Sequence, residues 1–433
     1  MTSGRTSETH DPAARAPQGP LRWLTFSSLS LIFFVVAAGT FSSLGVVLPA
    51  MVAELGWSWT RAGFGYALLG LSCGLASVAP AMLIRRIGVR SAIGAGAACM
   101  VAGFAALALA HSVWVYFAAT ALLGLAFALV STVPGTHVLT DLFRNRSTML
   151  GAYFTLGSLG QVAGPLMYVG FHEVARGWRP YWWMFAGLSL AAGVFTVATT
   201  PGRREERAHL AEPPEIESPG PMLEGLRDWT VRRALSTYQF YVVVAGYTTF
   251  LLINTTAHGF AVQHLAERGI DAKAAAAMLS LEALFGAGVT AAGGVIGEKV
   301  RAKTLMIVSL AATTLGVAGL AQAAGWGLMM VYAVGAGLGL GLSLLASTVL
   351  LLDYFGKKPN LELFSIMCLI STSAAIGPAF GGWARDALGS FTDMFWLGAA
   401  ATTAILALTL FLRPPALGAA TPDGPSLRSK PYE

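Results

Sequence analysis

Charged side chains are scarce in this chain. Only 12% of its 433 residues are Asp, Glu, Lys or Arg, whereas 55% are hydrophobic. Soluble globular proteins carry about 25% charge, so this composition excludes an ordinary soluble domain. The mean hydropathy of +0.63 agrees with this, and the two values together predict a protein that lies in the lipid bilayer.

Cysteine and the usual enzyme motifs are also scarce or missing. Cys73, Cys99 and Cys368 lie within apolar runs, at spacings that fit neither a metal site nor a disulfide framework. The chain has no Walker loop, no dinucleotide fingerprint and no nucleophile-base-acid set, and "GLGLGLS" falls inside an apolar run without a following soluble βαβ unit. The sequence therefore predicts no metal, no cofactor and no enzymatic activity.

Apolar runs fill most of the remaining sequence. Each is about 20 residues or longer, enough for a helix with a rise of 1.5 Å per residue to cross a ~30 Å hydrocarbon core. We place such helices at residues 25–52, 60–84, 91–110, 113–140, 149–172, 180–199, 236–262, 273–297, 303–322, 326–353, 361–387 and 391–411. The predicted fold class is an all-α membrane protein with twelve transmembrane helices.

Lys and Arg gather on one side of these predicted helices. With both termini on that side, it collects 22 of the 28 basic residues. The other side keeps Arg61, Arg176, Arg179, Arg268, Lys273 and Arg385. The crowded side is expected to be cytoplasmic, so the pI near 9.3 reflects loop topology and not nucleic-acid binding.

A polar stretch divides the helices six and six. It runs from Pro201 to Arg233 and reads as a cytoplasmic linker, flexible where Pro and Glu alternate. The predicted organisation is a cytoplasmic tail at 1–22, a six-helix bundle at 23–200, the linker at 201–234, a second six-helix bundle at 235–412 and a cytoplasmic tail at 413–433.

The two halves repeat each other at an offset of 213 residues. "AMLIRRIGVR" (81–90) ends the second predicted helix, and "GVIGEKVRAK" (294–303) ends the eighth. The same offset relates Gly124 to Gly337, Gly164-Pro165 to Gly377-Pro378, and Trp183 to Trp396. Two pseudo-symmetric six-helix bundles are typical of transporters, with a binding site near the midplane between them.

These loops resemble the signature of the major facilitator superfamily, G-x-x-x-[DE]-[RK]-x-G-x-[RK], over nearly the whole chain. Gly294, Glu298, Lys299 and Lys303 match the second copy, with Arg301 in place of the later glycine. The first copy keeps Arg86, Gly88 and Arg90 but has Ala81 for glycine and Arg85 for the acid. The resemblance implies the major facilitator fold and secondary active transport by alternating access.

Within this superfamily, three segments resemble the monocarboxylate-porter and oxalate/formate-antiporter branches: "FSSLGVVLPAMVAELGWSWTRAG", "LFRNRSTMLGAYFTLGSLGQVAGP" and "DYFGKKPNLELFSI". They imply a monomeric proton-coupled symporter of a small organic acid in a bacterial inner membrane. The arginine that this branch commonly has in the eighth helix is replaced by Thr290. A proton-antiport exporter of hydrophobic or cationic compounds is the alternative.

The resemblance also implies a cytoplasmic gate. In the family, the loop acid and bases latch the cytoplasmic ends of the two halves together, so Glu298 is expected near Ser147 and Thr148. For the first copy we predict a charge-swapped pair of Arg85 and Glu362. The full predicted gate is Gly294, Glu298, Lys299, Arg301, Lys303, Arg85, Arg86, Gly88, Arg90, Asp141, Asp353 and Glu362. The alternative is that these charges only set topology.

One acid lies deep in a predicted helix. Glu282 is roughly nine residues, or ~13 Å, from the outer end of the eighth helix, and a charge at that depth costs at least ~2.5 kcal/mol. We predict that it holds a proton or contacts substrate, with Asn254 and His258 near it. Further predicted site residues are Thr290, Gln161, Tyr247, Thr40, Ser43 and Ser343. If the eighth helix starts later, Glu282 reaches the outer surface instead.

Overall fold

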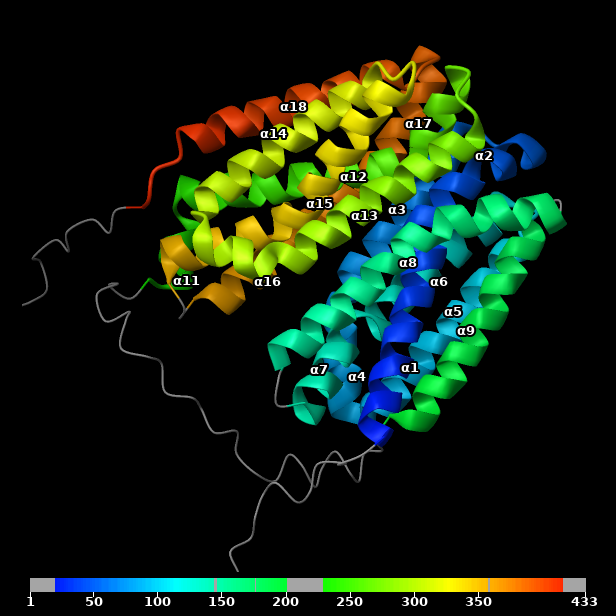
Figure 1. The fold of residues 1–433 in the computed structure, drawn as a ribbon, viewed down its shortest axis with the longest axis horizontal. Helices are drawn as coiled ribbons and strands as arrows, with labels where there is room; N and C mark the ends of the chain where they lie inside the picture. The colour runs from blue at the N-terminus through cyan, green and yellow to red at the C-terminus, as the bar shows by residue number, and fades with distance from the viewer. Residues whose placement is uncertain (1–19, 144–145, 176, 201–228, 357–358, 416–433) are drawn as a thin grey trace, which may run out of the picture.

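The computed structural model describes residues 20–143, 146–175, 177–200, 229–356 and 359–415. Within these residues the regular structure is entirely helical, as the long apolar runs predict (Figure 1). The helices form two bundles, one on each side of the undescribed residues 201–228. We call them the first bundle (20–200) and the second bundle (229–412).

Six helical spans make up the first bundle, and several of them are broken. Its elements are α1 (Pro20–Ala37), the π-helix η2 (Ala38–Ser42), α2 (Ser43–Leu55), α3 (Trp59–Leu75), the 3-10 turn η3 (Ala76–Val78), α4 (Ala79–Ile87), α5 (Val89–Ala108), α6 (Val113–Val130), α7 (Thr132–Leu142), α8 (Arg146–Ala175) and α9 (Arg179–Thr199). The first span bends at Thr40, whose ψ of −106° is not helical. Pro80 follows the break of the second span, in the first turn of α4, where proline is tolerated.

The second bundle repeats this arrangement. Its elements are α11 (Val231–Leu235), α12 (Tyr238–Glu267), α13 (Ala272–Lys299), α14 (Ala302–Ala321), α15 (Trp326–Phe355), α16 (Asn360–Ser371), the 3-10 turn η5 (Thr372–Ile376), α17 (Gly377–Leu388) and α18 (Thr392–Leu410). The linker boundary expected at residue 234 falls inside α11. The reason is local packing, because the Trp229 ring meets Phe355 at 5.2 Å and Thr230 caps α11.

Eleven helical spans among the described residues are long and apolar enough to cross a membrane. The fifth span, α8, is not one of these, although its 30 residues are long enough. It contains Gln161, Pro165 and several glycines, which lower its hydropathy. Since α8 packs against α1 and η2, it completes the first six-helix bundle.

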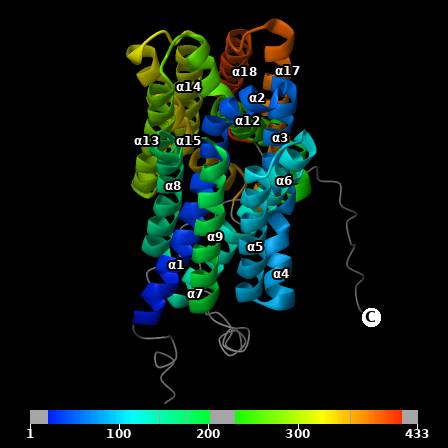
Figure 2. The ribbon, with the colours of Figure 1, turned by 90° about the vertical axis from the view of Figure 1, so that its right-hand side faces the viewer.

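The two bundles meet at one end and separate toward the other. Contacts between them run from α2 to α12, from α3 to α17 and from α8 to α13. Figure 2 looks onto the end where the bundles meet and shows α2 and α3 of the first bundle beside α17 of the second. We call this the joined end. At the opposite end, where α1 begins, α4 and α7 stand apart from α11 and α16 in Figure 1. We call this the divergent end.

The 213-residue repeat is visible in the packing. A side chain at Gly124 would collide with the backbone oxygen of Leu69, and one at Gly337 would lie 2.7 Å from that of Glu282. Both the glycines and their partners differ by 213 in number. The same helix crossing is therefore built twice, as expected for two pseudo-symmetric bundles.

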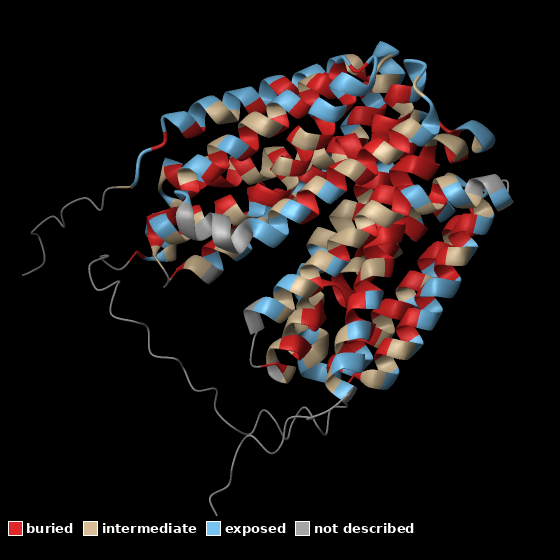
Figure 3. Ribbon diagram, viewed as in Figure 1, coloured by how far each residue is buried: buried red, intermediate tan, exposed pale blue. Residues whose placement is uncertain are grey.

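Buried residues lie inside each bundle and where the bundles join, while the outward faces are exposed (Figure 3). The exposed faces carry large apolar side chains, such as Leu190, Leu315 and Phe411. A soluble protein would expose few such residues, but lipid solvates them. The exposure pattern therefore fits a multi-pass membrane protein.

Candidate functional site

Glu282 is completely buried in the second bundle, about 15 Å along α13 from its start at the joined end. Its carboxylate accepts two hydrogen bonds. Tyr332 of α15 donates its hydroxyl to Oε2 at 2.7 Å, and Asn254 of α12 donates Nδ2–H to Oε1 at 3.1 Å. Three helices thus converge on one carboxylate, and both of these donors are neutral.

His258 is the fourth member of this group, one turn beyond Asn254 in α12. Its Nδ1 lies 3.0 Å from the backbone oxygen of Asn254 and 3.9 Å from Oε1 of Glu282. The hydrogen bond to the carbonyl assigns a proton to Nδ1. Nε2 is buried and has no hydrogen-bond partner among the described residues. We call Glu282, Asn254, His258 and Tyr332 the Glu282 cluster.

The first bundle forms a wall beside this cluster. Gly259 directly follows His258 in α12. A Cβ atom at Gly259 would lie 3.7 Å from the Tyr66 ring of α3. Tyr66 donates its hydroxyl to the backbone oxygen of Phe41 at 2.8 Å. Phe41 lies in the π-helix η2, and such bulges are frequent at functional sites. The cluster therefore lies against the boundary between the two bundles.

The electrostatics of the cluster are unusual for a membrane interior. Within the described residues, no Lys or Arg forms an ion pair with Glu282, and His258 is its nearest possible cation. A charged Glu282 beside a neutral histidine would be a buried net charge, which is costly. One proton shared by the pair makes it neutral, either as two neutral groups or as a carboxylate and an imidazolium. The arrangement can therefore hold and release a proton.

The other predicted site residues make their hydrogen bonds outside this cluster. Thr40 and Ser43 are buried in the first bundle, where Thr40 donates to the Val36 oxygen at 2.7 Å and Ser43 bonds the Tyr181 hydroxyl at 2.7 Å. Ser343 bonds Ser309 at 3.1 Å inside the second bundle.

The last three predicted site residues are only partly enclosed or exposed. Gln161 and Tyr247 are half-buried in α8 and α12. Thr290 is exposed and donates to the Gly286 oxygen at 2.9 Å. Of all the predicted site residues, the structure brings together only Glu282, Asn254 and His258.

The described gate residues lie at the divergent end, mostly exposed. These are Arg85, Arg86, Arg90, Arg301, Lys303, Asp353 and Glu362. Gly88 has a φ of 87°, which explains the glycine between α4 and α5. Lys303 donates to the Leu410 and Leu412 oxygens at 2.9 and 2.8 Å, and so caps the end of α18.

The predicted latch of Arg85 and Glu362, both described, is not engaged in this structure. Arg85 and Glu362 form no ion pair among the described residues, because the helices that carry them separate at the divergent end. The side chains of residues 141, 147 and 293–299 lie outside the described part of the chain, so Asp141, Gly294, Glu298 and Lys299 stay predictions.

The joined end carries a contact that the sequence analysis missed. Asp386 of α17 accepts hydrogen bonds from the first two N–H groups of α3, Trp59 at 3.1 Å and Thr60 at 2.8 Å. The Thr60 hydroxyl also donates to it, at 2.5 Å. Asp386 thus caps a helix of the other bundle with a carboxylate, an arrangement that the positive end of the helix dipole favours.

Glycines let α3 and α17 approach closely beside this cap. A side chain at Gly382 would lie 2.7 Å from the Trp59 carbonyl carbon, and one at Gly63 would lie 2.9 Å from that of Pro378. The Trp59 ring also packs edge-on against Phe260 and Phe391 of the second bundle. The joined end is therefore closed by tight packing together with the Asp386 cap.

Tyr332, Tyr66 and Asp386 are the functional candidates that sequence reasoning did not identify. A weak signal existed for Asp386, since the repeat offset places another acid, Glu173, at the equivalent position. Tyr332 has no such counterpart, because the equivalent position holds Ala119.

Comparison with known proteins identifies the fold. The family model described as the Major Facilitator Superfamily matches residues 29–321. The crystal structure of the nucleoside transporter NupG superposes with a TM-score of 0.72 at 12% identity, covering 90% of this chain and 98% of that one. A single-site variant of NupG gives the same TM-score at 11% identity.

A second transporter structure is similar over the same share of the chain. It is a bacterial homologue of the human lysosomal transporter Spinster in an inward-facing, unoccupied conformation. Its TM-score is 0.68 at 15% identity, with 90% of this chain and 95% of that chain covered. No curated protein matches the chain. At these identities the structural likeness shows the fold alone.

Proposed function

The chain belongs to the Major Facilitator Superfamily, and from this premise we propose that it couples transport of a small molecule to proton movement through Glu282. Family membership makes the protein a secondary transporter with a small-molecule substrate and not an enzyme. The proton coupling, the substrate class and the direction of transport are the proposed part.

The Glu282 cluster supports the coupling. Its carboxylate is fully buried, receives two neutral hydrogen bonds and has a histidine 3.9 Å away. Leu69 holds the equivalent position in the first bundle and is equally buried. Because leucine satisfies the fold there, an acid at residue 282 is not needed for packing. A buried acid in a membrane helix is by default a functional group.

The proposed substrate is a small organic acid. The segments that resemble the monocarboxylate and oxalate/formate branches support this class. No Lys or Arg pairs with Glu282 in the described part of the chain, so a carboxylate substrate would be bound by neutral donors or carried with its proton. That same observation favours a second candidate, the export of cationic or hydrophobic compounds in exchange for protons.

Orientation follows from the distribution of basic residues. The proposed cytoplasmic side is the divergent end, where α1 begins and where Arg85, Arg86 and Arg90 lie. The joined end then faces outward, so the conformation is inward-facing. We propose a bacterial inner-membrane location with both termini in the cytoplasm.

Proton flux in proteoliposomes tests this function. A pH dye trapped inside reports flux while short monocarboxylates, dicarboxylates and lipophilic cations are added outside in turn. Inward acidification with one acid is expected for wild type and is expected to be lost in Glu282→Gln. The glutamine side chain can still accept the Tyr332 hydrogen bond, so the variant should remain folded.

Asp393→Asn is the matched control, because Asp393 is an exposed acid in the first turn of α18. It should transport like wild type. Alkalinisation driven by entering cations would replace the organic-acid proposal with the exporter. Proton flux in Glu282→Gln equal to that of wild type would refute the role of Glu282 for either substrate.

A further inference from the structure

A groove of about 650 Å³ runs between α5 and α9 on the outer face of the first bundle. Its walls are mostly small apolar residues, among them Gly94, Ala98, Ala102 and Ala198. One charged residue, Arg90, lines it at the start of α5, which lies at the divergent end. The groove is therefore apolar along its length and positively charged at one end.

Comparison with the second bundle shows that small residues keep this groove hollow. At the 213-residue offset, α14 and α18 take the places of α5 and α9. Four of the side chains there are larger: Gly94 corresponds to Ile307, Ala102 to Leu315, Gly193 to Leu406 and Ala198 to Phe411. Two others, Thr403 and Ala407, are smaller than their counterparts Leu190 and Val194. The fold accommodates bulk at the first four positions, so it does not itself require the small residues of the first bundle.

The charge at the end of the groove also differs between the repeats. Lys303, equivalent to Arg90, donates to two carbonyl oxygens at the end of α18. Arg90 makes no hydrogen bond or ion pair with any described residue. In the first bundle, the Thr199 oxygen at the end of α9 instead accepts the Thr25 hydroxyl at 2.8 Å. Arg90 is thus a cation at the divergent end without a partner among the described residues.

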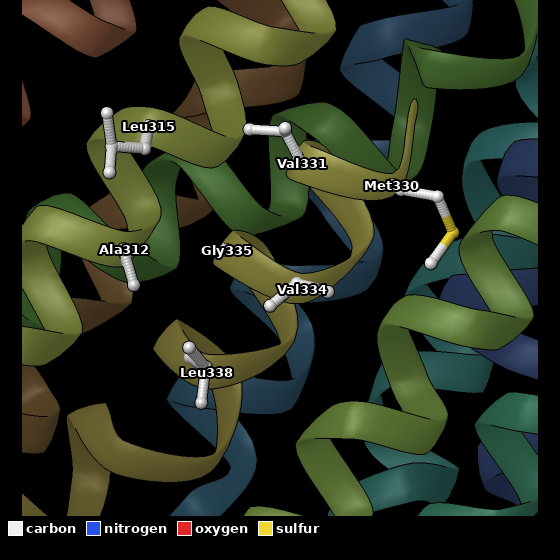
Figure 4. Close-up of a pocket in the computed structure, with 7 residues that line it drawn as sticks. All are labelled: Ala312, Leu315, Met330, Val331, Val334, Gly335 and Leu338. Atoms are coloured by element: carbon white, nitrogen blue, oxygen red, sulfur yellow. The ribbon is translucent and has the colours of Figure 1, made fainter. Parts of the chain in front are cut away.

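Two other grooves on the outer surface provide a contrast. One of about 400 Å³ lies between α14 and α15, and Figure 4 shows only apolar side chains around it, including Leu315, Met330 and Val334. Another of about 220 Å³ lies beside α12, α17 and α18. Neither is lined by a charged residue, so of these three grooves only the α5–α9 groove combines an apolar channel with a cation.

We propose that the α5–α9 groove binds an anionic phospholipid, with an acyl chain between the helices and the headgroup phosphate on Arg90. Guanidinium groups bind phosphate through paired hydrogen bonds. An acyl chain covers the apolar walls that the small residues leave open. This lipid site is separate from the Glu282 cluster.

Native mass spectrometry of the full-length protein tests the proposal. Phosphatidylglycerol and phosphatidylcholine with identical acyl chains are titrated onto the detergent-purified protein. Wild type is expected to retain phosphatidylglycerol more tightly. Arg90→Gln should weaken phosphatidylglycerol retention about fivefold, the effect of one basic residue near a membrane surface, and Arg90→Lys should restore most of it.

A groove-filling variant tests the position of the acyl chain. Ala102→Leu with Ala198→Phe introduces the residues of the second repeat at two exposed positions, so folding should be preserved, and thermal unfolding checks this. Retention of both lipids is expected to fall. Lipid retention equal to wild type in this folded variant would show that no acyl chain lies in the groove.

Arg232→Gln is the control for general attraction to basic surface. Arg232 is exposed in α11, on the other bundle, and lines none of the three grooves. Its loss should leave lipid retention unchanged. An equal decrease in Arg232→Gln and Arg90→Gln, or no preference of wild type for phosphatidylglycerol, would overturn the proposal. Because binding is measured without transport, neither outcome affects the proposed transport function.

Discussion

At the scale of single residues, Gly337 determines how closely α15 approaches Glu282. A side chain at residue 337 would lie 2.7 Å from the Glu282 backbone oxygen and 2.6 Å from Cβ of Phe285. Real Cβ atoms do not tolerate such contacts, so α13 and α15 would have to separate. Since Tyr332 on α15 donates to Glu282, the same separation would loosen the hydrogen bond to the carboxylate.

Gly337→Ala is therefore expected to destabilise the protein by about 1–3 kcal/mol, the usual effect of overpacking a tight contact. Thermal unfolding in one detergent measures this. Gly288→Ala is the control, because Gly288 lies in α13 with nothing within 4 Å of the added carbon. It should be neutral or slightly stabilising. Equal melting temperatures for the two variants would contradict the close crossing.

Sequence reasoning predicted part of the candidate site for a physical reason. Acids are rare in apolar runs, and counting residues along two helices places Asn254 at a depth similar to that of Glu282, with His258 about one turn nearer the outside. It could not place Ser43 or Ser343, because a hydroxyl bonds any nearby carbonyl or hydroxyl, and each of these bonds within its own bundle. The rotation of each helix about its axis decides whether such a hydroxyl faces the cavity or a neighbouring helix. Hydropathy indicates this rotation only weakly, because lipid-facing and buried faces are both apolar.

At the scale of elements, the cap of α3 by Asp386 joins two helices from different bundles. Helix α3 begins with Trp59, and its first two N–H groups both point to this carboxylate. The third, on Arg61, is satisfied by Ser58 within the first bundle. When the bundles separate at this end, two N–H groups lose their partner. The cap therefore stabilises the joined state specifically.

Asp386→Asn is expected to shift molecules away from the joined state. A carboxylate at a helix N-terminus contributes about 0.3–1 kcal/mol when exposed, which corresponds to a change in population of roughly two- to fivefold. Spin labels at Ala53 in α2 and Leu388 in α17, both exposed, report the distance across the joined end. The longer-distance population should grow.

Glu267→Gln is the control for this measurement, because it removes the ion pair with Arg385 that lies within the second bundle. Its distance distribution should match wild type. If Asp386→Asn also matches wild type, the hydrogen bonds of Asp386 do not hold the two bundles together.

Helix positions were largely predictable from the sequence, whereas only one of the two helix breaks described next was. Hydropathy defines a span by its average, so the runs at 25–52 and 361–387 read as single spans, although Gly377-Pro378 predicts a kink in the second. The structure breaks the first at Thr40 and the second at the 3-10 turn Thr372–Ile376. Gly377-Pro378 marks the second break, since Pro378 lacks an N–H for a helix that began upstream. No residue of comparable effect marks the first.

At the scale of the whole molecule, the joined end is closed and the divergent end is open. Packing and the Asp386 cap close the joined end, while Arg85 and Glu362 are exposed and unpaired in the described part of the divergent end. A transporter with alternating access also needs the reverse arrangement. One sequence has to encode both states. Charged residues that form an ion pair in only one state are therefore unpaired in the other. We therefore expect the predicted latch to form only in the state in which the divergent end closes.

Glu362→Lys is expected to disfavour that closed state, because it would place two positive charges together where α4 meets α16. Adding Arg85→Glu restores an attractive pair and should recover transport. Exposed ion pairs contribute about 0–1 kcal/mol, so the single variant should lower closure by up to about fivefold. Spin labels on α4 and α16 measure closure, and proteoliposome flux measures transport.

Arg85→Glu alone should resemble Glu362→Lys, since it pairs two acids. A double variant no better than either single variant would show that the two residues do not meet, and that each charge serves topology alone.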